Sequence, residues 1–160
     1  MKRKHSEQLA LYHQLTKCYN LAEVEMTCKS KVKSSELEKI TSSHDSYEIF
    51  KRLYETDKIE YVEQFIILLL NRANKVIGWV KISQGGITGT IADPRLIFQA
   101  GLLANATAII LSHNHPSGNK TPSSTDIELT RKVCQGGKLL DLNILDHVII
   151  TAEGYYSFAD

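Results

Sequence analysis

The chain has 160 residues, of which 42% are hydrophobic and 23% are charged, with 19 basic and 18 acidic side chains. This length predicts one domain with a substantial core, and the composition excludes a wholly disordered chain and a disulfide-stabilised mini-protein. The near balance of charge is unlike that of a domain built mainly to grip nucleic acid. No apolar run approaches the roughly 18 residues of a membrane span, and no hydrophobic signal core follows the basic start. We therefore expect a cytoplasmic protein without a membrane partner.

Residues 1–44 differ from the rest and are predicted to form an N-terminal extension ahead of a domain over residues 45–160. Apolar spacing in Glu7–Lys17 predicts a short amphipathic helix, and alternation in Leu21–Cys28 predicts an edge strand. The first 33 residues carry an excess of lysine and arginine, which is typical of a solvated segment or of an arm that contacts nucleic acid. An exposed edge strand could pair with another chain, so a monomer and an oligomer both fit this pattern.

From residue 46 onward the pattern predicts alternating strands and helices. The run Phe65–Leu70 is apolar at every position, as in a central strand covered on both faces. Asp93-Pro94 predicts a helix start, and Gly136-Gly137 predicts the C-cap of a later helix. The predicted elements are a helix over 46–56, strands over 65–70 and 76–83, a helix over 94–105, a strand over 107–111, a helix over 123–134, and strands over 142–151 and 155–157. Their order predicts an α/β fold in which helices sandwich a mixed β-sheet.

Two histidines and a carboxylate follow one of the predicted buried strands with the spacing of metal ligands. His113 and His115 are two residues apart, so in an extended chain both side chains point to the same face. Asp126 follows in the first turn of the next helix, after a loop that can fold back. Two histidines and one carboxylate suit zinc with an open fourth position, where a bound water can be activated for hydrolysis.

Each part of this pattern also has an ordinary structural explanation. A His-x-His pair alone is weak evidence for a metal. Ser123 and Asp126 also form a helix start, with Ser123 as the N-cap and Asp126 at the third helical position. The combination lies at the carboxyl end of a strand, where α/β sheets bind ligands. Both interpretations of Ser123 can hold, because a capping serine can also face a metal.

The order of these residues resembles the motif of the JAB/MPN (JAMM) zinc metallopeptidases, His-x-His-Pro followed by Ser-x-x-Asp. Here His113-Asn114-His115 is followed by the seven residues 116–122 and then by Ser123-Ser124-Thr125-Asp126. The sequence His-Asn-His-Pro-Ser-Gly, together with Asp146-His147 near the end, is most similar to the RadC-like branch of this family. The resemblance covers residues 46–160. The resemblance implies a three-layer α-β-α fold. The helix-hairpin-helix DNA-binding segment of longer RadC-type proteins is not recognised here, which argues against a direct role in DNA repair.

The resemblance also implies a mechanism. Zn²⁺ would be held by His113, His115 and Asp126. The family needs a glutamate at the start of the first core strand, and Glu63 matches it. Glu63 would take a proton from the attacking water and deliver it to the leaving amine, and Ser123 would hydrogen-bond to the developing oxyanion. The implied reaction is hydrolysis of a peptide or isopeptide bond in a peptide or protein substrate.

Other function classes fit the sequence less well. Zinc deaminases use His-x-Glu with Pro-Cys-x-x-Cys, and neither pattern is present. A metallophosphoesterase could use His-x-His but usually needs more ligands than this chain offers. A JAB-like domain that binds protein or DNA without catalysis, linked to DNA repair, is the remaining alternative. Loss of a ligand would favour that alternative, and none is missing.

A few other residues have more than one interpretation. Glu63 without the resemblance would be a solvated charge at a strand end, and Glu60 would face the other way. His147 could hydrogen-bond to a zinc ligand, or it could be a packed or surface histidine. Trp79, in an apolar strand, is expected in the core. The odd number of cysteines without Cys-x-x-Cys spacing predicts reduced thiols, at Cys18, Cys28 and Cys134.

Overall fold

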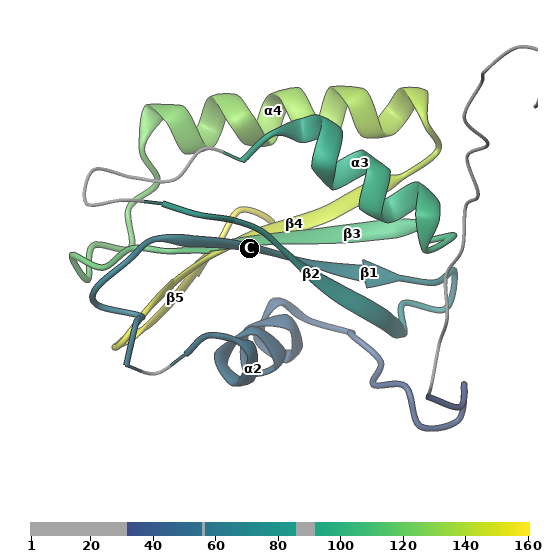
Figure 1. Ribbon diagram of the computed structural model, residues 1–160, viewed down its shortest axis with the longest axis horizontal. Coiled ribbons are helices and arrows are strands. Elements are labelled where there is room, and N and C mark those ends of the chain that lie inside the picture. The colour runs from purple at the N-terminus through teal and green to yellow at the C-terminus, as the bar shows by residue number, and fades with distance from the viewer. Residues whose placement is uncertain (1–31, 56, 86–91) are drawn as a thin grey trace, which may run out of the picture.

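A five-stranded β-sheet forms the centre of the molecule, and helices cover both of its faces (Figure 1). The computed structural model describes residues 32–55, 57–85 and 92–160. The elements in chain order are α2 (Ser43–Leu53), β1 (Gln64–Leu70), β2 (Val76–Gln84), α3 (Pro94–Leu103), β3 (Ala108–Asn114), α4 (Ser124–Leu139), β4 (Asn143–Thr151) and β5 (Gly154–Ser157). The predicted α/β fold is confirmed. The helix predicted at Glu7–Lys17 and the strand predicted at Leu21–Cys28 lie outside the described residues.

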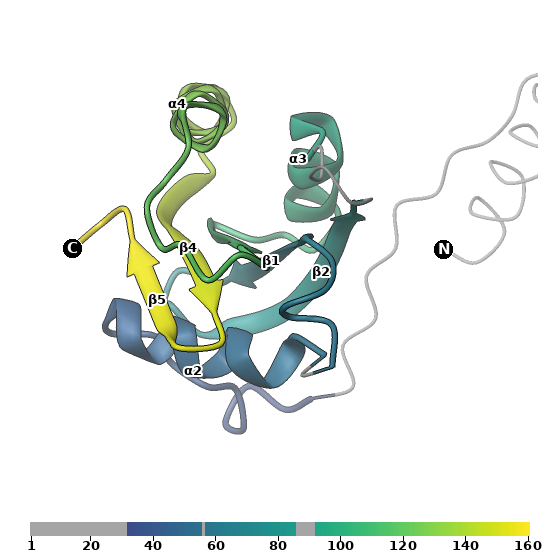
Figure 2. The same ribbon diagram turned by 90° about the vertical axis from the view of Figure 1, so that its left-hand side faces the viewer.

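The strand order β2-β1-β3-β4-β5 places β1 and β3 inside the sheet. β3 and β4 are parallel, whereas the other neighbouring strands are antiparallel, so the sheet is mixed as predicted. Every residue of β1 and β3 is buried, because α2 covers one face of the sheet and α3 and α4 cover the other (Figure 2). The uniform apolar run of β1 follows from this two-sided burial.

Two apolar layers hold the helices to the sheet. The layer beneath α2 includes Phe50 and Ile66, and the layer beneath α3 and α4 includes Ile67, Ile97 and Val133. Successive residues of a strand point to opposite faces. Neighbouring residues of β1 therefore belong to different layers, and both layers are anchored on the same central strands.

The helices α2, α3 and α4 each begin at a cap that the sequence contains. Ser42 and Ser123 cap α2 and α4, each in a capping box with the aspartate three residues later. The first cap starts α2 three residues before the predicted start at Ser46. The predicted start of α3 at Asp93-Pro94 is confirmed. In the described part of the chain, no helix has the combined length and apolarity needed to cross a membrane.

The helix α4 continues through Gly136 and Gly137 to Leu139, so the prediction that these glycines end it is wrong. A Cβ on Gly136 would lie 2.7 Å from ring atoms of Phe98, and one on Gly137 would lie 2.4 Å from the carbonyl oxygen of Leu142. The two glycines therefore allow α4 to approach α3 and the start of β4 closely. Glycine is required at these two positions for close packing, and not to end the helix.

Two predictions about strands differ from the structure because they depend on neighbours in the sheet. β3 extends to Asn114 instead of ending at Leu111, because its last residues still pair with β4, as far as Ile150. Trp79 is 50% exposed, so its predicted place in the core is wrong. It lies on β2, which forms an edge of the sheet and is covered less completely than β1.

The residues just before α2 already belong to the packed fold. Ile40 is buried in the layer beneath α2, and Lys39 forms an antiparallel β-bridge with Lys75. Packing therefore begins a few residues before the domain start predicted at residue 45. Cys134 of α4 is a free thiol, and the other two cysteines lie outside the described residues.

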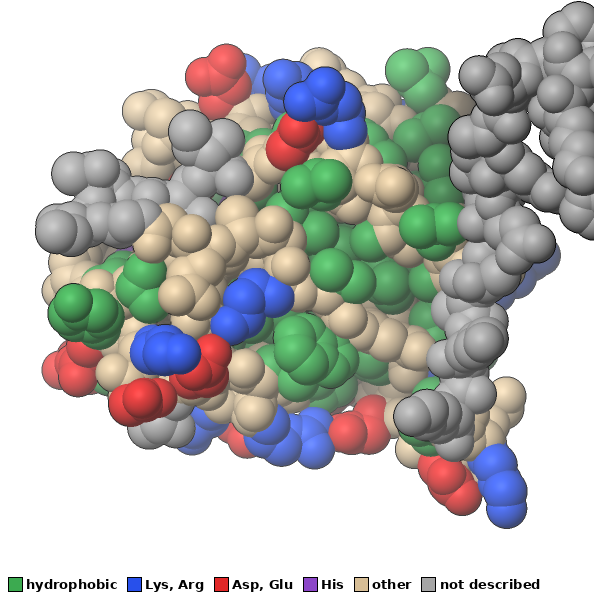
Figure 3. All heavy atoms as spheres, in the orientation of Figure 1, with side chains coloured by type: hydrophobic (Ala, Val, Ile, Leu, Met, Phe, Trp, Pro, Cys, Tyr) green, Lys and Arg blue, Asp and Glu red, His purple; other side chains and the backbone are tan. Residues whose placement is uncertain are grey.

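An apolar groove of about 550 Å³ lies between the edge strand β2 and α3. Apolar side chains gather on this face of the molecule (Figure 3). The groove is lined in part by Ile77, Trp79, Val80, Leu96 and Leu103. None of the sequence-predicted site residues lines it.

Candidate metal centre

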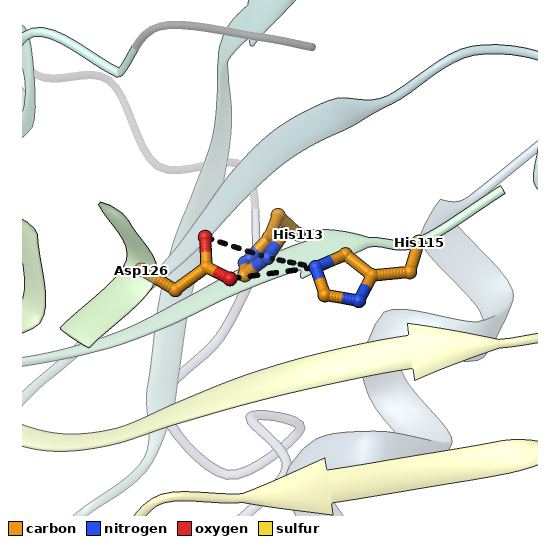
Figure 4. A group of neighbouring side chains, drawn as sticks. All are labelled: His113, His115 and Asp126. Atoms are coloured by element: carbon orange, nitrogen blue, oxygen red, sulfur yellow. Dashed lines mark hydrogen bonds and ion pairs between the residues drawn. The ribbon is translucent and has the colours of Figure 1, made fainter. Parts of the chain in front are cut away.

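His113, His115 and Asp126 meet at the carboxyl end of β3 (Figure 4). One ligand atom from each residue lies within 4.8 Å of the others. The Nε2 atoms of the two histidines are 2.9 Å apart. Oδ1 of Asp126 lies 3.2 Å from Nε2 of His113, and Oδ2 lies 3.5 Å from Nε2 of His115. Two imidazole nitrogens and a carboxylate in this arrangement, the metal-ligand group, could hold a divalent cation.

The end of β3 fixes both histidines. His113 is buried and pairs with Phe65 of β1 on one side and Ile149 of β4 on the other. His115 follows the strand, is half-buried, and donates its backbone N–H to the carbonyl oxygen of Ile150 at 2.9 Å. Because alternate residues of an extended chain share a face, the two rings point the same way.

The start of α4 places Asp126. Its Oδ2 accepts hydrogen bonds from the backbone N–H and the hydroxyl of Ser123, at 2.7 and 2.6 Å. Burial would raise the pKa of Asp126, but hydrogen bonds with His113, His115 and Ser123 hold it well below its ordinary value. The carboxylate is therefore ionised at neutral pH, as a metal ligand requires.

Glu63 precedes β1, the strand that pairs with the histidine-bearing β3. The pairing of β1 with β3 ends at Phe65 opposite His113, so Glu63 and His115 both lie just beyond the same end of this strand pair. The hydrogen bond with Asp126 is the largest cause of the raised pKa of His115, and the charge of Glu63 raises it further. A half-buried carboxylate thus lies within electrostatic reach of the metal-ligand group.

Ser123 acts as the N-cap of α4, which is one of its two predicted interpretations. Its exposed hydroxyl donates to Oδ2 of Asp126 and lies 2.8 Å from the hydroxyl of Thr125. A serine hydroxyl carries a single proton. In this structure that proton is directed to the carboxylate of the metal-ligand group.

His147 of β4 lies behind His113, fully buried. Its Nε2 is 2.8 Å from Nδ1 of His113, and its Nδ1 is 2.6 Å from the hydroxyl oxygen of Thr130. His147 therefore contacts the metal-ligand group and is no surface residue. Thr130 was missed by the sequence analysis, although it stands one helical turn after Asp126 and so shares its face of α4.

Asn114, between the two histidines, was also missed. Its side-chain oxygen accepts from the backbone N–H of Gln64 at 2.7 Å, and its amide donates to the carbonyl oxygens of Ile59 and Val62 at 2.7 and 2.9 Å. These three bonds tie the segment around Glu63 to β3. Strand alternation could have indicated its role, because it places Asn114 on the opposite face from His113 and His115, toward other partners.

Comparisons with known proteins identify the family to which this chain is similar. Residues 40–160 match the family model of the RadC-like JAB domain. A UPF0758 protein of Flavobacterium johnsoniae is 48% identical over 124 residues, which are 78% of this chain and 53% of that protein. UPF0758 proteins of Geotalea uraniireducens and Porphyromonas gingivalis are 40% and 46% identical, over 78% and 61% of this chain and 53% and 44% of their own lengths. The chain spans about half the length of the curated relatives it matches.

The motif, the mixed sheet between helices and these matches agree, and the resemblance predicted from the sequence is confirmed. The match covers the described strands and helices that carry the metal-ligand group. The chain belongs to the RadC-like JAB domain family.

Proposed function

We propose that this chain is a zinc-dependent hydrolase that cleaves a peptide or isopeptide bond. The observation that carries the proposal is the convergence of His113, His115 and Asp126 within 4.8 Å. Three protein ligands leave one position of tetrahedral zinc for water, which is the arrangement of catalytic zinc sites. Two imidazoles favour zinc over magnesium or calcium, because those ions prefer oxygen ligands.

A zinc ion at this site would supply a Lewis acid and lower the pKa of a coordinated water from about 15.7 to about 7. His113 and His115 would each present Nε2, and Asp126 would present a carboxylate oxygen. The buried position of His113 would exclude bulk water from one side of the site. The more exposed side, near His115, would admit the substrate.

We assign Glu63 as the general base and acid. Its carboxylate would take a proton from the attacking water and return it to the leaving amine. Its position just beyond the Phe65–His113 pair, from which its charge acts on His115, supports this assignment. The hydrogen bonds of Asn114 would keep Glu63 in place, because they hold the segment before β1 against β3.

We assign Ser123 as the donor to the developing oxyanion. The hydroxyl would exchange its bond to Oδ2 of Asp126 for one to the carbonyl oxygen of the scissile bond. Loss of such a donor costs about 3–4 kcal/mol of transition-state stabilisation. The exposed position of Ser123, at the rim of the metal-ligand group, supports access to a substrate.

The first test is the metal content of the purified full chain. We expect about one zinc per chain in the wild type and none in His113→Ala/His115→Ala, because catalytic zinc needs three protein ligands. His44→Ala is the matched control, since His44 is exposed near Tyr47 and Tyr155 and belongs to no ligand group in the described residues.

The second test is hydrolysis of a panel of peptides and isopeptide-linked peptides, with and without a chelator. Cleavage that the chelator abolishes and zinc restores would support the proposal. A wild-type chain that holds no zinc, even after reconstitution, would contradict it. The alternative of a domain that binds protein or DNA without catalysis would then lead, and DNA binding that weakens steeply with salt would identify the nucleic-acid version.

A further inference from the structure

His147 is a buried titratable residue that the proposed reaction does not use. It lies on β4 between His113 of β3 and Thr130 of α4. Its ring stacks on Phe158, with ring centroids 5.0 Å apart, and also contacts Phe65. The adjacent Asp146 accepts a hydrogen bond from the backbone N–H of His147 instead of from its ring. Both ring nitrogens therefore face other partners, whose chemistry sets the position of the proton.

The hydroxyl of Thr130 fixes the direction of these hydrogen bonds. Its oxygen lies 2.6 Å from the backbone carbonyl oxygen of Asp126. A carbonyl oxygen can only accept, so the single hydroxyl proton of Thr130 is used there. At its other contact, 2.6 Å from Nδ1 of His147, Thr130 can therefore only accept. His147 must carry a proton on Nδ1.

A neutral imidazole with its proton on Nδ1 has a lone pair on Nε2. The ring of His147 is fully buried, and its nitrogens contact a hydroxyl and an imidazole, neither of them an anion that would stabilise a charged ring. Nε2 of His147 faces Nδ1 of His113 at 2.8 Å, so His113 is the donor in this contact. His113 then carries a proton on Nδ1, which leaves Nε2, the nitrogen that faces His115 and Asp126, as its metal-binding atom.

A single backbone contact fixes a proton on Nδ1 of His115 as well. Its Nδ1 lies 2.6 Å from the backbone carbonyl oxygen of Asn119, which can only accept. Its Nε2 is therefore the nitrogen left for the metal-ligand group. The two Nε2 atoms lie 2.9 Å apart, a contact that needs a shared proton or a metal ion between them. A backbone group orients His115, whereas side chains from two other elements orient His113.

We propose that Thr130 and His147 form a hydrogen-bond relay that fixes the tautomer and orientation of His113, so that Nε2 is presented to the metal. Both are positioning residues, since neither has an atom in the metal-ligand group. The relay starts at the backbone of Asp126 and ends at the ring of His113, so it links two of the three ligands across α4, β4 and β3. The inference rests on the proposed metal site and adds two residues to what that site requires.

The test compares zinc affinity in Thr130→Val and Thr130→Ser, measured by competition with a chromogenic chelator. Valine keeps the shape of threonine and removes the hydroxyl, whereas serine keeps the hydroxyl. We expect Thr130→Val and His147→Phe to bind zinc about 10–100-fold more weakly than the wild type. We expect Thr130→Ser to bind like the wild type. Circular dichroism of each variant would check that the fold is kept.

A readout that structural damage alone would not produce is the position of the imidazole protons. Nitrogen-15 NMR of the histidine-labelled full chain should show His147 protonated at Nδ1 and not at Nε2, and Thr130→Val should populate the other tautomer. Unchanged zinc affinity and an unchanged tautomer in Thr130→Val would overturn the relay and leave the proposed function intact. A wild-type chain that binds no zinc would overturn the proposed function, and the role of the relay with it.

Discussion

The helices α2 and α4 begin with nearly the same sequence, Ser42-Ser43-His44-Asp45 and Ser123-Ser124-Thr125-Asp126. Both starts form capping boxes with the serine hydroxyl and the aspartate carboxylate in the same roles. The surroundings of the aspartates differ. Asp45 accepts its other hydrogen bonds from Thr41 on the surface, whereas Asp126 faces the two histidines of β3. The Ser-x-x-Asp motif therefore specifies a helix start, and the neighbouring strand turns one of the two into a metal-ligand candidate.

The largest expected difference concerns the two aspartates. Asp126→Asn should reduce zinc from about one per chain to almost none and abolish hydrolysis, because a neutral amide is a poor zinc ligand. Asp45→Asn should keep both. Metal analysis of the two purified variants measures the difference. Equal zinc content in the two variants would mean that Asp126 is only part of a cap.

Glu63 is assigned to the same site as Asp126, but as a proton carrier and not as a metal ligand. Glu63→Gln should keep zinc and lose activity by about 10²–10⁴-fold, the usual contribution of a positioned general base. Glu60→Gln is the control, three residues earlier in the same segment. Steady-state kinetics on the best peptide substrate, with metal content measured in parallel, decides the matter. Full activity in Glu63→Gln would remove Glu63 from the mechanism.

Ser42 and Ser123 both cap a helix, but only Ser123 is assigned a role in the reaction. Ser42→Ala and Ser123→Ala should each lower the free energy of unfolding by about 1 kcal/mol, because each removes an N-cap. Only Ser123→Ala should also lose activity, by about 10²–10³-fold, since only its hydroxyl is assigned to the oxyanion. Urea unfolding and kcat measure the two effects separately. Similar activity in both variants would reduce Ser123 to a cap.

The smallest effect is a pH dependence of the cap on α2. Hydrogen bonds from Thr41 are the largest cause that lowers the pKa of Asp45 below its ordinary value of 3.8. A lowered pKa contributes stability that is present above the unfolded-state value and is lost as the pH falls through the folded-state value. The stability difference between wild type and Asp45→Asn should thus be largest near pH 6 and shrink below pH 4. A difference that stays constant with pH would contradict this account.

The metal-ligand group was predictable because its signals are local. The spacing of His113 and His115 depends on strand alternation, and the place of Asp126 depends on a helix start. Contacts between distant elements were not predictable in this way. Gly136 was misinterpreted because its neighbour Phe98 belongs to another helix, and Trp79 because a strand's edge position depends on the order of the whole sheet.

The relay shows the same division. Thr130 and His147 are 17 residues apart and meet only because α4 packs beside the parallel pair of β3 and β4. Asp146-His147 was noticed as a sequence feature, but its partner was not. Sequence motifs therefore identify the groups that could touch a metal, and the fold identifies the groups that orient them.

The half-exposed Trp79 has a practical consequence, since it is the single tryptophan of the chain and lies on the groove between β2 and α3. Its fluorescence reports on that groove alone, without any label. Because the indole is already half exposed, unfolding changes its surroundings less than those of a fully buried tryptophan, and circular dichroism is the better probe of stability. The same property makes the emission a sensitive indicator of any molecule that settles over the edge of the sheet.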